Sequence, residues 1–276
     1  MAAVYRPRRC LAIAGRRWHG VAMDILACLR LQLEFGADEA LQPRPRDRRQ
    51  AEPPSLAALS LARPAPPASP PVPSPIPMPA PLVAVPSLAE LEAAQAVLPG
   101  CPLIATAGHM VFGAGPTGAP MFLADTPAEA EDMSGQPFGA EVGWLLDRML
   151  ESLGLTRATV RLAYAVPWRP PGSRAPTPSE RDLCRPYLAR HIALARPPAV
   201  VCLGVQPAAM LLPGTTPAEL RRLRGSWQAI RLPDLDTPIP LLPSLSLEQV
   251  LKKPSEKALI WADLIQLAQH LAKNTS

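Results

Sequence analysis

Four short apolar segments alternate with helical segments between residues 120 and 271, and few folds accommodate that order. Each apolar segment is flanked by turn-forming residues and carries apolar side chains at successive positions, as strands buried on both faces do. The segments lie at 120–125, 160–166, 199–204 and 240–244. The pattern predicts an α/β fold, a three-layer α/β/α sandwich with a four-stranded parallel sheet between two layers of helices.

Helix start signals accompany this alternation. Ser87 stands three residues before Glu90, which is the capping-box spacing, and Thr177 precedes Pro178 and Glu180 in a similar arrangement. Helices are expected at 87–98, 139–153, 177–195, 207–212 and 255–271. In parallel α/β sheets the ligand site lies beyond the carboxyl ends of the strands. The loops at those ends are 125–139, 167–176, 204–207 and 244–254.

Proline content separates an N-terminal region from the globular part. Of the 38 prolines, 15 lie between residues 43 and 86. Proline fixes φ and removes a backbone donor, so this stretch is expected to be an extended, solvated spacer. The expected divisions are a disordered basic arm at 1–22, a short helix within 23–41, a proline-rich linker at 42–86 and a globular domain at 87–276.

The positive charge belongs to the N-terminal region. The whole chain carries 28 basic and 23 acidic residues, a net charge of +5. The first fifty residues hold ten arginines and five acids, so the remaining residues carry 18 of each sign. The globular domain therefore has no overall charge that would attract a phosphate backbone.

Two further features concern the compartment. No apolar run approaches the roughly 18 residues that a membrane span needs, so no membrane association is expected. The five cysteines, at 10, 28, 101, 184 and 202, include no Cys-x-x-Cys pair. This pattern indicates a reducing cytoplasm and not a disulfide-stapled secreted domain.

The four loops carry motifs in a recognisable order. They are contained in LADTPAEAEDMSGQPFGAEVGWLLDRML at 123–150, WRPPGSRAPTPSERDLCRPYLARHIALARPPAVVCLG at 168–204, LRGSW at 223–227 and PSLSLEQVLKKPSEKALIWADL at 243–264. Together they resemble the motifs of the family 4 uracil-DNA glycosylases, with few gaps from Ser87 to Leu271. The resemblance implies the fold of that family and base-excision repair, the hydrolysis of the uracil N-glycosidic bond in DNA.

The chemistry of that family explains which residues are needed. The enzyme extrudes the uridine into a pocket, stacks an aromatic ring on the base and reads its Watson–Crick edge. An acidic group near the sugar holds water, and a donor near the uracil oxygen stabilises the departing anion. In the family, an asparagine reads the edge and a histidine in the last motif is the donor.

When the family's roles are assigned by position in the motifs, several of them fall on residues that differ from those of the family. Asp125 stands where the family has a catalytic glutamate, while Pro127 and Phe138 remain as base-binding residues. Tyr164 takes the place of the edge-reading asparagine, and it lacks an amide's paired donor and acceptor. Ser246 occupies the degenerate catalytic position of the histidine. Loss of both groups implies weak or lost excision of uracil.

Two of these residues have alternative explanations. Phe138 serves either as a platform for the base or as core packing after a turn. Asp125 either acts in catalysis or caps the helical turn that follows it.

Basic residues in the same loops are candidate phosphate contacts. They are Arg169, Arg174, Arg224 and Lys252. The partner would then be DNA, including uracil-containing DNA, and the protein is expected to be a monomer. The alternative for these four residues is an ordinary solvated face.

The family's iron–sulfur cluster needs four thiolates. Only Cys101 and Cys184 fall at ligand-like positions, because Leu98 and Trp168 occupy the other two. No cluster and no other metal are therefore expected, and the cysteines are expected to pack as small apolar residues.

Three hypotheses on function follow. The first is a diverged superfamily member with weak or lost uracil excision. The second is an active glycosylase driven by Asp125, with backbone amides in place of the histidine. The third is a non-catalytic module that binds DNA or a repair partner, tethered by the arm and linker.

Overall fold

The computed structural model describes residue 82 and residues 85–233 and 235–274. The expected basic arm, the short helix within 23–41 and almost all of the proline-rich linker lie outside these residues. Their boundaries, and the boundary of the globular domain, therefore stay predictions.

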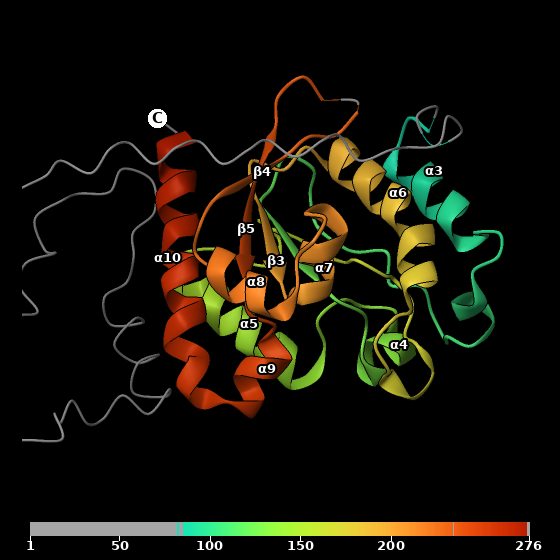
Figure 1. Cartoon of the computed structure of the whole chain (residues 1–276), viewed down its shortest axis with the longest axis horizontal. Coiled ribbons are helices and arrows are strands. Elements are labelled where there is room, and N and C mark those ends of the chain that lie inside the picture. The colour runs from blue at the N-terminus through green and yellow to red at the C-terminus, as the bar shows by residue number, and fades with distance from the viewer. Residues whose placement is uncertain (1–81, 83–84, 234, 275–276) are drawn as a thin grey trace, which may run out of the picture.

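A five-stranded sheet in the order β2-β1-β3-β5-β4 forms the centre of the domain (Figure 1). Four strands are parallel, and they are the four expected from the sequence: β1 Met121–Ala124, β2 Arg161–Tyr164, β3 Val200–Leu203 and β5 Ile239–Ser244. The fifth, β4 Gln228–Ile230, pairs antiparallel with β5 at the edge. It is three residues long and has no apolar run, so the sequence pattern does not indicate it.

Helices cover both faces of the sheet. They are α3 Leu88–Ala96, α4 Glu129–Ser134, α5 Ala140–Ser152, α6 Pro178–Ala195, α7 Val205–Leu211, α8 Pro217–Leu223, α9 Leu247–Lys252 and α10 Lys257–Asn274. Short 3₁₀ turns lie at Pro102–Ala105, Pro171–Ser173 and Pro254–Glu256. The fold class expected from the sequence is confirmed.

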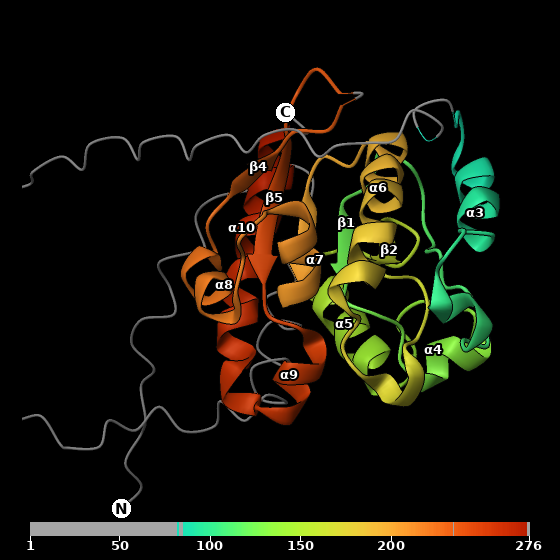
Figure 2. The ribbon, with the colours of Figure 1, turned by 45° about the vertical axis from the view of Figure 1, so that its right-hand side comes forward.

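Alternate residues of each strand contribute to two separate apolar cores. Met121 and Cys202 pack with α6 and α7 on one face, whereas Phe122 and Val201 pack with α5 and α10 on the other. Figure 2 shows α6 and α7 on one side of the strands and α10 on the other. Both faces are buried, and this explains why the strands are apolar at successive positions.

None of the described helices is long and apolar enough to cross a membrane. The longest, α6 and α10, carry charged and polar side chains along their length.

The start of α6 fixes the loop that precedes it. The Thr177 hydroxyl accepts a hydrogen bond from the Glu180 N–H at 3.3 Å, and Glu180 Oε2 accepts one from the Thr177 N–H at 2.7 Å. Glu180 is buried and also pairs with Arg174, whose Nη2 lies 2.6 Å from Oε1. This capping box, expected from the sequence, holds the segment 171–176 in position.

Replacing Thr177 with alanine should lower the free energy of unfolding by about 1 kcal/mol, because one orphan N–H loses its side-chain acceptor. Urea unfolding monitored by far-UV circular dichroism measures this change. Thr177→Ser keeps the hydroxyl and is the matched control, expected to unfold close to the wild type. An alanine variant as stable as the serine variant would contradict this role of the cap.

Candidate functional site

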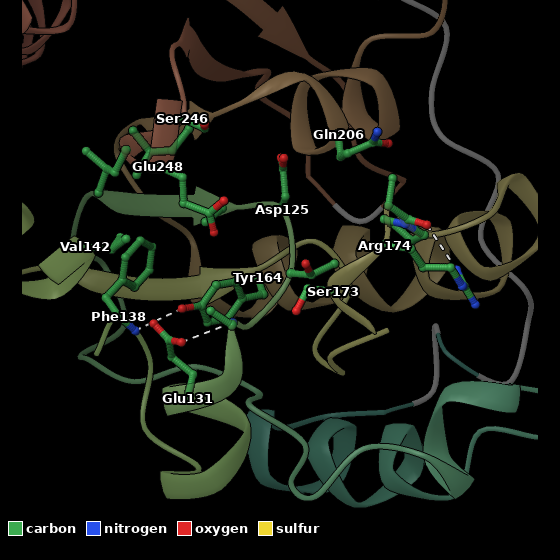
Figure 3. Close-up of a pocket in the computed structure, with 17 residues that line it drawn as sticks. Asp125, Glu131, Phe138, Val142, Tyr164, Ser173, Arg174, Gln206, Ser246 and Glu248 are labelled. Carbon is green, nitrogen blue, oxygen red and sulfur yellow. Dashed lines mark hydrogen bonds between the residues drawn. The ribbon is translucent and has the colours of Figure 1, made fainter. Parts of the chain in front are cut away.

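A pocket of about 180 Å³ lies beyond the carboxyl ends of β1, β2 and β3. Its walls come from the four loops that the parallel sheet predicts as the site. The polar and aromatic residues that line it are Asp125, Thr126, Glu131, Phe138, Tyr164, Ser173, Arg174, Gln206, Ser246 and Glu248. Figure 3 shows these side chains around one cavity.

Asp125 follows β1 directly and packs against the backbone of Gly204, the residue that follows β3. A β-carbon at Gly204 would lie 2.6 Å from Asp125 Oδ1, and Gly204 has a φ of +127°. Only glycine allows this backbone conformation and this close approach. Within the part of the chain that the structure describes, Oδ1 is buried and has no hydrogen-bond partner. Packing and a backbone hydrogen bond from Gln206 therefore hold the carboxylate, and Oδ1 is left as an unused acceptor.

Burial, followed by the nearby carboxylate of Glu248, raises the pKa of Asp125 to about 7. A backbone hydrogen bond from Gln206 opposes this increase in pKa. The ionised form is disfavoured because it is desolvated and lies near a like charge. Near neutral pH the carboxyl therefore exchanges between its protonated and ionised forms, which suits a group that transfers protons.

Two aromatic rings form another wall of the pocket. The rings of Phe138 and Tyr164 are stacked, with centroids 5.2 Å apart and an angle of 18° between their planes. The Tyr164 hydroxyl accepts a hydrogen bond from the Phe138 N–H at 3.0 Å. Burial, followed by the charge of Glu131, raises the pKa of Tyr164. The ring expected to stack on a base thus stacks on Tyr164, and it is only 1% exposed.

Glu131 and Arg157 hold the loop that carries Phe138. Glu131 Oε2 accepts a hydrogen bond from the Ala128 N–H at 3.1 Å, and Oε1 accepts one from the Gly139 N–H at 2.8 Å. Arg157 donates to the Phe138 carbonyl at 2.7 Å. Phe138 has a φ of +54°, a conformation that is unfavourable for a bulky residue and needs such support. Both side chains therefore position Phe138.

Ser246 and Glu248 enter the pocket from the start of α9. The Ser246 hydroxyl caps the helix, accepting a hydrogen bond from the Gln249 N–H at 3.2 Å. Glu248 lies in the first turn, with its carboxylate on the same side of the pocket as that of Asp125 (Figure 3). Sequence reasoning singled out Ser246 but missed Glu248, although it lies two residues further along the same motif.

Pro127 is separated from the other expected base-binding residues. It is buried and does not line the cavity, whereas Thr126 and Ala128 on either side do. No described histidine lines the pocket. His109 contacts Asp132, while the rings of His191 and His270 pack on Phe112 and Trp227.

The expected phosphate-binding residues have different surroundings. Arg174 lines the pocket and is paired with Glu180. Arg169 Nε donates to Ser173 Oγ at 3.1 Å, and its Nη2 lies 3.5 Å from Glu129 Oε2. Lys252 is exposed at the end of α9.

Arg224 is directed toward the interior. Its Nη1 lies 2.7 Å from Asp263 Oδ1, and the carboxylate of Asp263 also accepts a hydrogen bond from the buried Ser244 hydroxyl at 2.7 Å. Breaking a buried pair leaves an uncompensated charge, so a contact from Arg224 to phosphate would be unfavourable.

The positions expected for an iron–sulfur cluster lie together in an apolar core. Leu98, Cys101, Trp168 and Cys184 all belong to the core under α6. Burial raises the pKa of the Cys184 thiol, and Cys101 raises it further. No group of three or more His, Cys, Asp or Glu among the described residues is placed to hold a metal ion. This donor set does not fit a four-thiolate cluster, because Leu98 and Trp168 supply no ligand.

Comparisons with known proteins all point to uracil-DNA glycosylases. A sequence model described as the uracil DNA glycosylase superfamily matches residues 112–265. The chain is 40% identical over 105 residues to a type-4 uracil-DNA glycosylase of Archaeoglobus fulgidus, covering 38% of this chain and 53% of that protein. It is 32% identical over 127 residues to the Thermotoga maritima enzyme of the same name, covering 46% of this chain and 66% of the relative.

A third relative is matched over more of its length. The type-4 uracil-DNA glycosylase of Pyrobaculum aerophilum is 30% identical over 146 residues, which cover 52% of this chain and 74% of that protein. The matches to the Archaeoglobus and Thermotoga proteins span between half and two thirds of those relatives.

Asp125→Asn should stabilise the fold by about 2–4 kcal/mol at pH 8 and by little at pH 4. The pKa of Asp125 is raised in the folded state, so its stabilising contribution is complete below the unfolded pKa of 3.8 and is lost as pH rises to about 7. Urea unfolding at both pH values measures the difference. A variant equally stabilised or destabilised at pH 4 and pH 8 would contradict the raised pKa.

Proposed function

This chain belongs to the uracil DNA glycosylase superfamily, and we propose that it is a DNA-binding protein of the base-excision type whose excision of uracil is weak or lost. This proposal rests on the side chains that line the pocket. Where the departing uracil would need a donor, Ser246 caps α9 and the carboxylate of Glu248 lies close by.

Uracil leaves its sugar as an anion, so the catalyst must stabilise negative charge as the bond breaks. The Ser246 oxygen is held at the start of α9 by the Gln249 N–H, so its remaining O–H is a short, neutral donor in place of a histidine, and no described histidine lines the pocket. A carboxylate at Glu248 repels an anion. Loss of one transition-state donor typically lowers the rate by about a hundred- to a thousandfold, and an added like charge lowers it further.

Reading of the uracil edge is also impaired. Tyr164 has a single hydroxyl, which already accepts the Phe138 N–H, so it cannot pair with two adjacent groups of the base as an amide does. Its ring covers one face of Phe138, which is where a base would stack.

The stacking of Tyr164 on Phe138 favours a second candidate function, a non-catalytic module that binds DNA or a repair partner. If Tyr164 stays on Phe138, no base enters and binding is limited to the outer surface. Lys252, Arg169 and Arg174 are then the proposed phosphate contacts, at the mouth of the pocket and along α9. We further propose that the protein is a monomer, and that it works in a reducing cytoplasm, which agrees with three buried free cysteines at positions 101, 184 and 202.

The double substitution Ser246→His and Tyr164→Asn should raise uracil release by about a hundredfold, because it restores a donor and an amide. Cleavage at abasic sites in a uracil-containing oligonucleotide measures release. Ser246→Ala with Tyr164→Phe is the matched control and should show no gain. Rapid uracil release by the unmodified protein, unchanged in the double variant, would contradict the proposal.

We also propose that the protein folds without an iron–sulfur cluster, with Trp168 and Leu98 packing where two thiolates would be needed. Protein purified without oxygen should contain less than about one iron per chain and show no absorption near 400 nm. Cys184→Ser should leave the iron content unchanged. Brown protein with four irons, lost in Cys184→Ser, would overturn the proposal. Leu98→Cys with Trp168→Cys should bind iron if the variant folds.

A further inference from the structure

The charged groups that face the pocket are mainly carboxylates, which lie beside the neutral polar side chains of Thr126, Ser173, Gln206 and Ser246. Glu131 uses both carboxylate oxygens on backbone N–H groups, and the Arg174 guanidinium is neutralised by two contacts with Glu180. Glu248 is exposed and lines the same cavity as Asp125, whose Oδ1 is buried without a hydrogen-bond partner in the described part of the chain. Two carboxylates therefore remain to interact with whatever enters.

This arrangement indicates the charge of the ligand. The buried Asp125 carboxylate and the exposed Glu248 carboxylate at the rim of the cavity repel each other, and a proton or a positively charged ligand relieves the repulsion. Phe138 and Tyr164 line the pocket beside them but are stacked on each other, so a base gains an aromatic face only when the Tyr164 ring leaves Phe138 (Figure 3). Aromatic faces attract cations, and this attraction increases where water is excluded. A planar cation fits both features.

Among the bases of DNA, those alkylated on a ring nitrogen that bears no hydrogen, such as N7 of guanine or N3 of adenine, carry a positive charge. Such a base leaves its sugar as a neutral molecule, so its departure needs no donor to stabilise an anion. No histidine among the described residues lines the pocket, which disfavours release of uracil but not release of an alkylated base. We propose that this pocket accepts a cationic, N-alkylated nucleobase in DNA and releases it by hydrolysis, an inference that rests on the proposed function.

The reaction balances without a further reactant. The bond between the ring nitrogen and C1′ breaks, and its electron pair neutralises the positive base. A water oxygen bonds to C1′, and Asp125 accepts a proton from that water and then passes it to solvent. The products are an abasic site, the neutral alkylated base and one proton. Asp125 is thus the general base, and Glu248 attracts the cation.

The pH dependence follows from the charges around Asp125. The ionisable groups that face it or share its pocket are Glu248 on α9, Cys202 on β3, Tyr164 on β2, Glu131 on α4 and Arg174 before α6. Since Asp125 must be ionised to accept a proton, kcat/KM for an alkylated base should rise with pH to a plateau above about 7. Glu248→Gln should move this rise to lower pH.

The test compares three duplexes that are identical except for one position, which carries uracil, N7-methylguanine or ordinary guanine. Full-length protein is incubated with each, and released base is measured against spontaneous release without protein. Anisotropy of the labelled guanine duplex measures DNA binding separately. We expect release of N7-methylguanine at least about tenfold above the spontaneous rate and faster than release of uracil.

The other outcomes separate this inference from the proposed function. Binding of the guanine duplex with release of neither base overturns the inference and leaves a non-catalytic DNA-binding protein. Faster release of uracil than of N7-methylguanine overturns the inference, and rapid release of uracil also overturns the proposal of weak uracil excision. Absence of binding to every duplex overturns the proposed function itself.

Substitution of Glu248 should change the release rates of N7-methylguanine and uracil in different directions. Glu248→Gln should lower release of N7-methylguanine about tenfold while leaving uracil release unchanged or higher, because the removed charge attracts a cation and repels an anion. Glu141→Gln, an exposed carboxylate in the first turn of α5, is the matched control and should change neither rate. Equal loss on both substrates in Glu248→Gln would contradict an electrostatic role.

Discussion

The contact between Asp125 and Gly204 determines what the pocket can do. It lies where the adjacent parallel strands β1 and β3 end, and it requires a residue without a side chain at position 204. Packing against the glycine backbone buries Oδ1 and leaves it without a partner, so the carboxyl is desolvated and its pKa rises to about 7. Glu248, Phe138 and Tyr164 line the pocket around the Asp125 carboxyl, whose position and protonation depend on this contact.

The same fold can thus carry a pocket for a positively charged base in place of one that stabilises a departing anion. In the superfamily chemistry, a donor stabilises a departing anion. Here the corresponding region holds Ser246, engaged as a helix cap, and a carboxylate at Glu248. Such a pocket repels an anion and attracts a cation. The sheet, the helices and the loop order are unaffected, because they depend on apolar packing on both faces of the sheet and not on the pocket side chains.

Much of the fold could be predicted from the sequence because it depends on local patterns. The four parallel strands follow from continuous apolar runs, and the start of α6 follows from Thr177 and Glu180. The edge strand β4 could not be predicted, since three residues carry no periodicity and their pairing depends on β5.

The site was predicted only in part. The resemblance to the family motifs singled out Asp125, Tyr164, Phe138 and Ser246, and all four line one pocket in the structure. The Phe138–Tyr164 stack and the internal pairing of Arg224 with Asp263 depend on side-chain directions that no linear pattern contains. Glu248 escaped notice because its significance comes from its distance to Asp125.

The most direct measurement is a carbon-13 NMR titration of the Asp125 carboxyl, assigned by the signal lost in Asp125→Asn. An acidic, desolvated pocket predicts a midpoint near pH 7 that falls in Glu248→Gln. A midpoint near 4, identical in the two proteins, would show that the carboxyl is solvated and independent of Glu248, and would contradict this account of the pocket.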